Sequence, residues 1–209
     1  MTVSDAQLQD QVAAIVEADT LPSIVQAGHP VLRGQSVEYS GQLGSAQLDA
    51  LIEVMRKVMH AAPGVGLAAP QLGIGLQLAV LEDLYDVTES VAAARSREPL
   101  EFLAILNPRY SPLGSGTASF YEGCLSMSGW QAVVERPASV RLAYTDPAGT
   151  AVGAEFSGWQ ARIVQHETDH LGGTLYIDKA NTRSLADNAE YAARWAQPGI
   201  GLAQEGLRF

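Results

Sequence analysis

The sequence predicts an α+β domain in which antiparallel or mixed β-sheets pack around one central helix. Hydrophobic residues occupy 47% of the 209 positions and charged residues 17%, which is a globular composition at the length of one domain. Segments with the character of strands come before a helix predicted at 159–171, and this order favours an α+β fold. We find no internal repeat and no linker to a second domain.

The first part of the chain is expected to contain two helices. Residues 4–18 place apolar side chains at helical spacing, and the same spacing recurs over 48–59, with Ser45 as the N-cap. Pro63 and the glycines that follow it end the second helix. Between the helices, "GHPVLR" at 28–33 predicts a turn followed by an extended segment.

Two buried strands are expected next. "GLQLAVLE" at 75–82 and "FLAILNP" at 102–108 have the required apolar character, and Pro108 ends the second strand. Residues 83–101 form a polar, Ala-rich excursion between them.

The rest of the chain predicts a hairpin and two helices. Residues 138–149 run as a strand into a turn, and 151–158 form the second strand of the hairpin. The helix at 159–171 follows directly. The region 174–209 predicts a short extended piece, a helix around 184–196 and a Gly-rich tail.

Charge and cysteine content narrow the class of protein. The net charge of −10 argues against nucleic acid as the main ligand, because phosphate contacts require a basic surface. No apolar run approaches the roughly 20 residues of a membrane span. Residues 1–20 contain four acidic residues and no Lys or Arg, so we expect no secretory or mitochondrial leader. Cys124 is the single cysteine, and we expect a reduced, cytoplasmic protein.

The segment "QHETDH" at 165–170 has the spacing of a metal site. Residues i and i+4 of a helix share a face, so His166 and His170 can direct two imidazoles at one ion. Glu167 lies about 100° around the helix from His166, close enough to exchange a proton with water at the site without being a ligand. The alternative is a solvated polar face with two unrelated histidines. With a bound ion, this helix is the central, metal-binding helix of the predicted fold.

The identity of the third ligand decides between three kinds of metal site. The long metzincin motif requires a histidine where this sequence has Tyr176. A thermolysin-like zinc peptidase would take a glutamate from a later helix, and Glu190 is at a suitable separation. Cys124, in "YEGCLSMSGW", would offer a thiolate. His29 and His60 belong to no motif, and we expect surface or structural roles for both.

Three segments together resemble the signature motifs of the peptide deformylases. The family patterns are G-x-G-x-A-A-x-Q, E-G-C-x-S and Q-H-E-x-D-H. They are matched in order by Gly64–Gln71, Glu122–Ser126 and Gln165–His170. "GHPVLR" and Asn107–Pro108 are also similar to the family. Three independent motifs at compatible separations make a chance match very improbable.

The resemblance implies a metallohydrolase that removes the N-formyl group from the formyl-methionine of newly made proteins and releases formate. It assigns 22–180 to the catalytic domain, 1–21 to an N-terminal extension and 181–209 to a C-terminal helix and tail. The implied partners are nascent formyl-methionyl peptides and, transiently, the ribosome. We expect a monomer that binds neither a specific nucleic acid nor a membrane.

By match of position, the resemblance implies that Cys124, His166 and His170 hold one divalent metal ion. Ferrous iron is expected, and zinc, nickel or cobalt are alternatives. A thiol bound to a metal is deprotonated, so Cys124 would carry a negative charge. Glu167 would take a proton from the attacking water and pass it to the departing amine. Glu122 would hold the second nitrogen of a histidine ligand and so fix its tautomer.

The family's oxyanion donors are matched by the side-chain amide of Gln71 and the backbone N–H of Leu125. The glycines of the first motif, Gly64 and Gly66, would let the substrate backbone approach closely and lie along this loop like an added strand. An apolar slot would receive the methionine side chain. Its expected walls are Val65, Trp159 and Ile163, with Trp159 larger than the leucine expected from the family.

Some features depart from the family or leave rivals open. "CLSMSGW" has serine where the family commonly has proline, and the C-terminal region balances four basic with four acidic residues, so docking on the ribosome through a basic helix is not expected. Asp169 and Arg136 are either a structural ion pair or two unconnected charges. One rival function is a zinc peptidase that uses Glu190. The other is an inactive relative that binds formylated peptides, against which the intact Glu167 and Gln71 argue.

Overall fold

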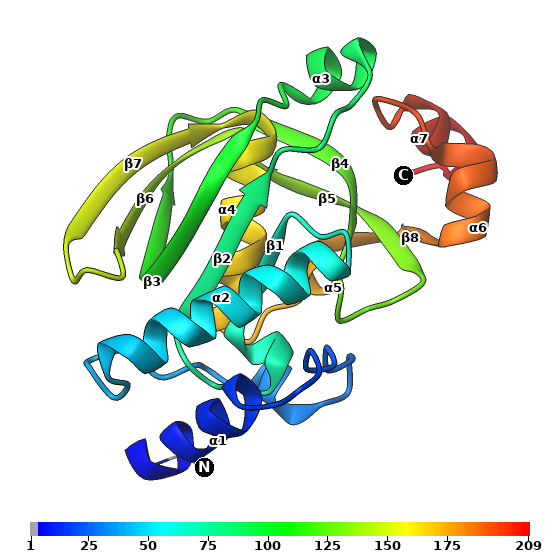
Figure 1. Ribbon diagram of the computed structural model, residues 1–209. Helices are drawn as coiled ribbons and strands as arrows, with labels where there is room; N and C mark the ends of the chain where they lie inside the picture. Colours follow the sequence, from blue (N-terminus) through cyan, green and yellow to red (C-terminus); the bar gives the residue numbers. More distant parts are fainter. Residues whose placement is uncertain (1–3) are drawn as a thin grey trace.

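Two antiparallel sheets enclose one long helix (Figure 1). The computed structural model describes residues 4–209. The five-stranded sheet has the order β1-β2-β3-β6-β7, and the three-stranded sheet has the order β4-β5-β8. The strands are β1 Gly66–Ala68, β2 Leu78–Asp83, β3 Leu100–Pro112, β4 Thr117–Gly123, β5 Trp130–Pro137, β6 Ser139–Thr145, β7 Ala151–Ser157 and β8 Ala180–Asp187. The predicted α+β class is therefore confirmed.

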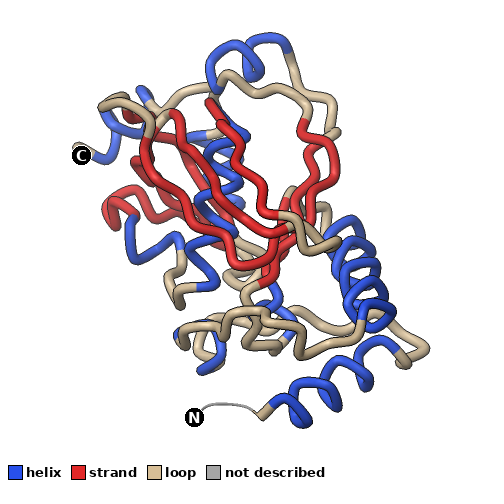
Figure 2. The backbone as a smooth tube through the Cα atoms, turned by 90° about the vertical axis from the view of Figure 1, so that its left-hand side faces the viewer, coloured by secondary structure: helices blue, strands red, loops and turns tan. Residues whose placement is uncertain are grey.

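The helices differ in how they relate to the sheets. The long α4 contacts strands of both sheets, whereas α1 and α2 pack against each other at one end of the molecule (Figure 1). The helices are α1 Asp5–Val16, α2 Ser45–Ala61, α3 Glu89–Arg95, α4 Gly158–Leu171, α5 Tyr176–Lys179, α6 Asn188–Glu190 and α7 Gly201–Leu207. Figure 2 shows the strands gathered in the middle of the molecule, with helices on several sides of them.

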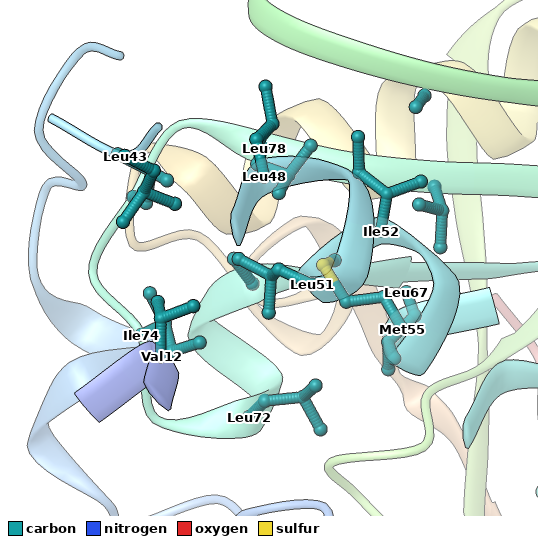
Figure 3. Packing of buried hydrophobic residues seen from close by; sticks show 14 of the residues in the cluster. Val12, Leu43, Leu48, Leu51, Ile52, Met55, Leu67, Leu72, Ile74 and Leu78 are labelled. Carbon is teal, nitrogen blue, oxygen red and sulfur yellow. The ribbon is translucent and has the colours of Figure 1, made fainter. Parts of the chain in front are cut away.

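The apolar face of α2 builds the largest part of the core. Leu48, Leu51 and Met55 recur at three- and four-residue spacing, and all three are buried (Figure 3). They pack with Val12 of α1 and Ile74 of the loop before β2. Fully burying a side chain of this size contributes about 1.5–3 kcal/mol. This cluster therefore anchors the glycine-rich segment that follows α2.

Several predicted boundaries need correction near the N-terminus. Gly44, not Ser45, is the N-cap of α2, and it makes no side-chain capping bond. The segment expected to be extended after residue 28 contains a 3₁₀ helix, Pro30–Arg33, because proline at its first position already has a helical φ. The nitrogen Nδ1 of His29 caps this turn by accepting a hydrogen bond from the N–H of Val31.

The prediction that Pro108 ends a strand is wrong, because β3 continues to Pro112. The pairing of β3 with β6 shifts register between Leu106 and Arg109, so the proline stands in an irregularity where no ladder hydrogen bond is required of it. Asn107 adopts a left-handed conformation there, with φ of 51°. Its side chain bonds both the N–H and the carbonyl of Tyr39, which compensates for the interrupted ladder.

Three strands and the C-terminal region were not foreseen correctly, and the first of these strands is β1, in the segment expected to be a loop. The segments that form β4 and β5 were not assigned, although they carry the cysteine motif between them. The helix expected over 184–196 begins only at Asn188, because 180–187 pairs with β5 as strand β8. A π-helical turn, Tyr191–Trp195, and α7 follow it and pack on β4 and β5.

Candidate metal centre and active site

Two segments distant in the sequence bring the predicted ligands together. Cys124 follows directly after β4, while His166 and His170 lie on one face of α4. Their ligand atoms all lie within 4.8 Å of one another, and the Cys124 sulfur is 3.3 Å from Nε2 of His170. One thiolate and two imidazoles converging on one point fit a divalent transition metal with a further coordination position open.

A buried carboxylate orients the first histidine. Nδ1 of His166 lies 2.9 Å from an oxygen of Glu122, so the other ring nitrogen is free to face a metal. Arg136 donates to Glu122 at 2.6 Å and to Asp169 at 2.7 Å, and Arg162 donates to Glu122 as well. The ion pair of Arg136 with Asp169 is therefore present, and Arg136 links β5 to the metal-binding helix.

Burial and neighbouring charges shift the pKa values of Glu122 and His170. Burial alone would raise the pKa of Glu122, but the hydrogen bond with His166 and the ion pair with Arg136 hold that pKa far below its ordinary value. Burial, reinforced by the charges of His166 and Arg136, lowers the pKa of His170. A lowered pKa favours the neutral imidazole, which is the form that binds metal ions.

Glu167 is buried beside the metal centre, and within residues 4–209 no cationic side chain bonds to its carboxylate. Its Oε2 has no hydrogen-bond partner among the described residues. Burial raises the pKa of Glu167 to about 7 in the metal-free protein, with His166 and Arg136 opposing the shift. A carboxylate with a free oxygen and such a pKa can both accept and return a proton near neutral pH.

The backbone of the glycine-rich segment packs closely against the Glu167 carboxylate. A Cβ atom on Gly66 would lie 2.3 Å from Oε1 of Glu167, and one on Gly64 would lie 2.9 Å from the Leu125 side chain. Both distances are far below van der Waals contact. The two glycines therefore make room for protein side chains, which adds to the close substrate approach expected from the sequence.

Gln71 presents its amide nitrogen toward the cysteine. Its oxygen accepts the N–H of Ala68 at 2.8 Å, which orients the nitrogen to within 3.7 Å of the Cys124 sulfur and 3.3 Å of the Ser126 hydroxyl. In the described part of the chain, the backbone N–H of Leu125 donates to no protein group. Two donors thus adjoin the metal centre, as expected for an oxyanion site.

A cleft of about 560 Å³ opens over these residues. The cysteine, His166 and Glu167 line it, and so do the three residues expected to receive a methionine side chain. These are Val65, Trp159 and Ile163. The structure thus brings every predicted site residue to one cavity or its immediate support.

The competing ligand and the remaining histidines lie elsewhere. Glu190 is exposed and pairs with Arg194 on the surface, so the structure does not bring it to the histidines. Tyr176, at the position of the missing metzincin histidine, is buried with its ring stacked 6.2 Å from that of His166. His60 pairs with Glu82 away from the site.

One supporting residue was missed. Arg162 is buried and donates to Glu122 and to the carbonyls of Val134 and Ala118, which ties α4 to β4 and β5. It stands four residues before His166, on the same helix face. That spacing was the available signal, but an arginine at helical spacing is more often solvated.

Comparisons with known proteins agree with this geometry. The family model described as polypeptide deformylase matches residues 21–186. Peptide deformylase 3 of Streptomyces avermitilis is 53% identical over 202 residues, covering 97% of this chain and 90% of the relative. Peptide deformylase 1 of Streptomyces coelicolor is 55% identical over 186 residues, covering 89% and 85%.

Solved structures are similar as well. The Met-Ala-Ser-bound class I type b peptide deformylase from Acinetobacter baumannii has a TM-score of 0.69 at 28% identity, with 78% of this chain and 99% of that chain covered. A peptide deformylase from Synechococcus elongatus in complex with actinonin has a TM-score of 0.66 at 34% identity, with 79% and 84% covered.

Among residues 4–209, no helix is both long and apolar enough to cross a membrane.

Proposed function

The chain belongs to the peptide deformylase family, whose members remove the N-formyl group from nascent peptides, and from this premise we propose a role for each residue of its metal centre. The observation that carries the proposal is the convergence of Cys124, His166 and His170 beside the buried carboxylate of Glu167. This family is metal-dependent, and these three residues would hold the ion. When bound, the ion would supply a Lewis acid for the formyl group and for water.

Ferrous iron is the metal that we propose. The donor set of one thiolate and two imidazoles is compatible with it and also with zinc, nickel or cobalt. The support around His166 favours a firmly held ion, because Glu122 fixes its tautomer and two buried arginines hold Glu122 in place.

Glu167 would act as the general base and then as the general acid. Its free Oε2 would accept the proton of the attacking water, and the same carboxyl group would deliver that proton to the departing amine nitrogen. Gly66 keeps this carboxylate in place by leaving room for it. Burial excludes bulk water, so the proton stays between the two reacting partners.

Gln71 and the N–H of Leu125 would stabilise the oxygen on which negative charge develops. Both donors are fixed before substrate binds, Gln71 through the N–H of Ala68 and Leu125 through its backbone. Preorganised donors of this kind contribute about 3–4 kcal/mol to the transition state.

The substrate would be an N-formyl-methionyl peptide whose methionine enters the slot between Val65, Trp159 and Ile163. The slot is apolar, so formyl-Met should react far faster than formyl-Asp. One methylene in such a pocket changes binding by about 1–3 kcal/mol, so formyl-Leu should be tolerated. An N-acetyl peptide should be poor because its extra methyl group crowds the attacked carbon.

We further propose that the protein works as a cytoplasmic monomer on chains that emerge from the ribosome. Support comes from the substrate, since formylated N-termini first appear there. The C-terminal region contains four basic and four acidic residues, so we assign no ribosome contact to a basic helix.

Formate release and metal content, measured together on anaerobically purified protein, test the proposal. The wild type should release formate from a formyl-Met peptide and contain one metal ion per chain. Glu167→Gln should keep the metal but lose about 10²- to 10⁴-fold in kcat, because the residue carries the proton and is no ligand. A metal-loaded Glu167→Gln protein with the wild-type rate would contradict the role of this residue.

A further inference from the structure

One wall of the cleft is built by parts of the chain outside the three motifs. Arg95, at the end of α3, lines the cleft together with Asn188 and Tyr191 of the C-terminal segment. The guanidinium of Arg95 donates to the carbonyls of Pro198 and Gln197, at 3.2 and 3.4 Å. Figure 1 shows α3 and the C-terminal helices at the same end of the molecule. The excursion after β2 and the C-terminal segment are thus joined over the cleft.

Arg95 differs in charge balance from the other arginines near the cleft. Arg162 is compensated by Glu122, and Arg97, which also approaches the Trp159 ring, is compensated by a two-pronged pair with Asp83. Arg95 meets only carbonyl oxygens and ring faces, and no carboxylate pairs with it in the described part of the chain. Its positive charge is therefore available to whatever occupies the cleft.

The position of Arg95 relates this charge to the substrate. Its guanidinium lies 4.9 Å from the centre of the Trp159 ring, and Trp159 lines the slot assigned to methionine. The charge consequently lies beside the Trp159 wall of that slot, at the edge that also contacts the C-terminal segment, which we call the rim. Residues that follow methionine in an extended peptide would pass this rim, with alternate side chains directed toward it.

We propose that Arg95 determines specificity by favouring formylated peptides that carry a carboxylate shortly after the formyl-methionine. This inference rests on the proposed function and adds a substrate preference to it. A planar guanidinium already held by two carbonyls retains free donors and a fixed orientation, which suits recognition of a carboxylate. The preference should be modest, because an ion pair at a solvated rim is worth about two- to five-fold in affinity.

The test uses C-terminally amidated formyl-Met peptides with Asp, Asn or Lys at position two, three or four. Amidation removes the terminal carboxylate, which would otherwise imitate the acidic side chain. For the metal-loaded wild type, we expect kcat/KM to be about two- to five-fold higher for Asp than for Asn at one of these positions, and lower for Lys. The difference should lie in KM and should shrink in 1 M salt, where the screening length falls to about 3 Å.

Two substitutions of Arg95 separate its charge from its contact with the C-terminal segment. Arg95→Gln should abolish the preference for Asp, whereas Arg95→Lys should keep most of it. Arg141→Gln removes one positive charge from an exposed pair between Arg141 of β6 and Glu155 of β7, and should leave the preference unchanged. The Asn peptide should be deformylated by all four proteins.

Equal rates for Asp and Asn peptides in the wild type would overturn the inference, as would a preference lost equally in Arg95→Gln and Arg95→Lys. The latter result would show that bracing of the C-terminal segment is what matters. Absence of formate from every peptide would instead contradict the proposed function itself, and the inference with it.

Discussion

Gly66 shows how a residue without a side chain determines the position of one that carries chemistry. A Cβ atom there would come within 2.3 Å of the Glu167 carboxylate, and β1 is buried on all sides. Gly66→Ala should therefore displace the carboxylate and lower kcat about 10²-fold, since a misplacement of about 1 Å can cost that much. Metal content should be unchanged, because no ligand is touched.

Gly75→Ala is the matched control for this prediction. It makes the same chemical change in a nearby loop where an added Cβ meets nothing within 4 Å. Its kcat should equal that of the wild type. If Gly66→Ala also turned over at the wild-type rate, the close contact with Glu167 would have no part in catalysis.

The sequence indicated the chemical residues of the site better than their support. His166 and Glu167 could be found because metal and proton chemistry restrict both residue type and spacing, whereas Cys124 and Glu190 stayed equal candidates until the resemblance to the family favoured Cys124. The contact of Gly66 with Glu167 could not, because it depends on how β1 meets α4 in three dimensions. Arg162 was missed for the same reason, since only the fold brings it to Glu122.

Two buried arginines connect α4 to the small sheet, Arg162 from the helix and Arg136 from β5. Arg136 of β5 is 2% exposed and bridges Glu122 and Asp169. Arg136→Met should lower the free energy of unfolding by about 3 kcal/mol, near the lower end of the usual cost of breaking a buried pair. The lower end is expected because Arg162 and Lys179 still pair with the two carboxylates.

Urea unfolding of the metal-free proteins measures this effect without a contribution from the ion. Arg141→Met breaks an exposed pair with Glu155 of the neighbouring strand β7, and should lower the free energy of unfolding by less than about 1 kcal/mol. Equal costs for the two variants would show that Arg136 does not connect the elements as its contacts indicate.

A second ion pair joins α2 to β2 and predicts a dependence on pH. The hydrogen bond from Arg56 lowers the pKa of Glu82 below its ordinary 4.5, against the opposing effect of burial. The folded state therefore favours the ionised form. Its contribution to stability is fully present above pH 4.5 and is lost as the pH falls through the lowered pKa.

The comparison of metal-free wild type with Glu82→Gln tests this sign. The wild type should be the more stable protein at pH 6–7, and the gap should narrow steadily below about pH 4.5. Urea unfolding at several pH values measures it. A gap that widened toward acid would mean that Glu82 is protonated in the folded protein.

Elements were predictable where the pattern within one segment decides the structure. The spacing of apolar residues in α2 and of the two histidines in α4 are such patterns, and both helices lie where they were expected. β3 was ended too early because the bulge at Asn107 that tolerates Pro108 is held by Tyr39, a contact distant in sequence. The second half of β8, 184–187, was expected to be helical, but its pairing with β5 overrides local propensity.

The residues of the metal centre come from distant parts of the molecule. Cys124 comes from the end of the small sheet, and both histidines come from the helix that the large sheet covers. In the unfolded chain these ligands are far apart, so the ion should bind the folded state almost exclusively. Metal binding then increases the free energy of unfolding, by about 2.7 kcal/mol at a free metal concentration 100 times Kd.

Removing the ion should therefore lower Tm by about 5–10 °C for a protein of this length. The measurement compares thermal unfolding of chelator-treated protein with the same sample reloaded anaerobically with ferrous iron or cobalt. Cys124→Ala leaves only two ligands, so reloading should raise its Tm little or not at all. Glu190→Ala changes an exposed carboxylate paired with Arg194, so reloading with metal should raise the Tm of this variant as much as that of the wild type. Because a zinc peptidase using Glu190 would reverse these two results, a Cys124→Ala protein that recovers the wild-type increment would refute the thiolate-containing site.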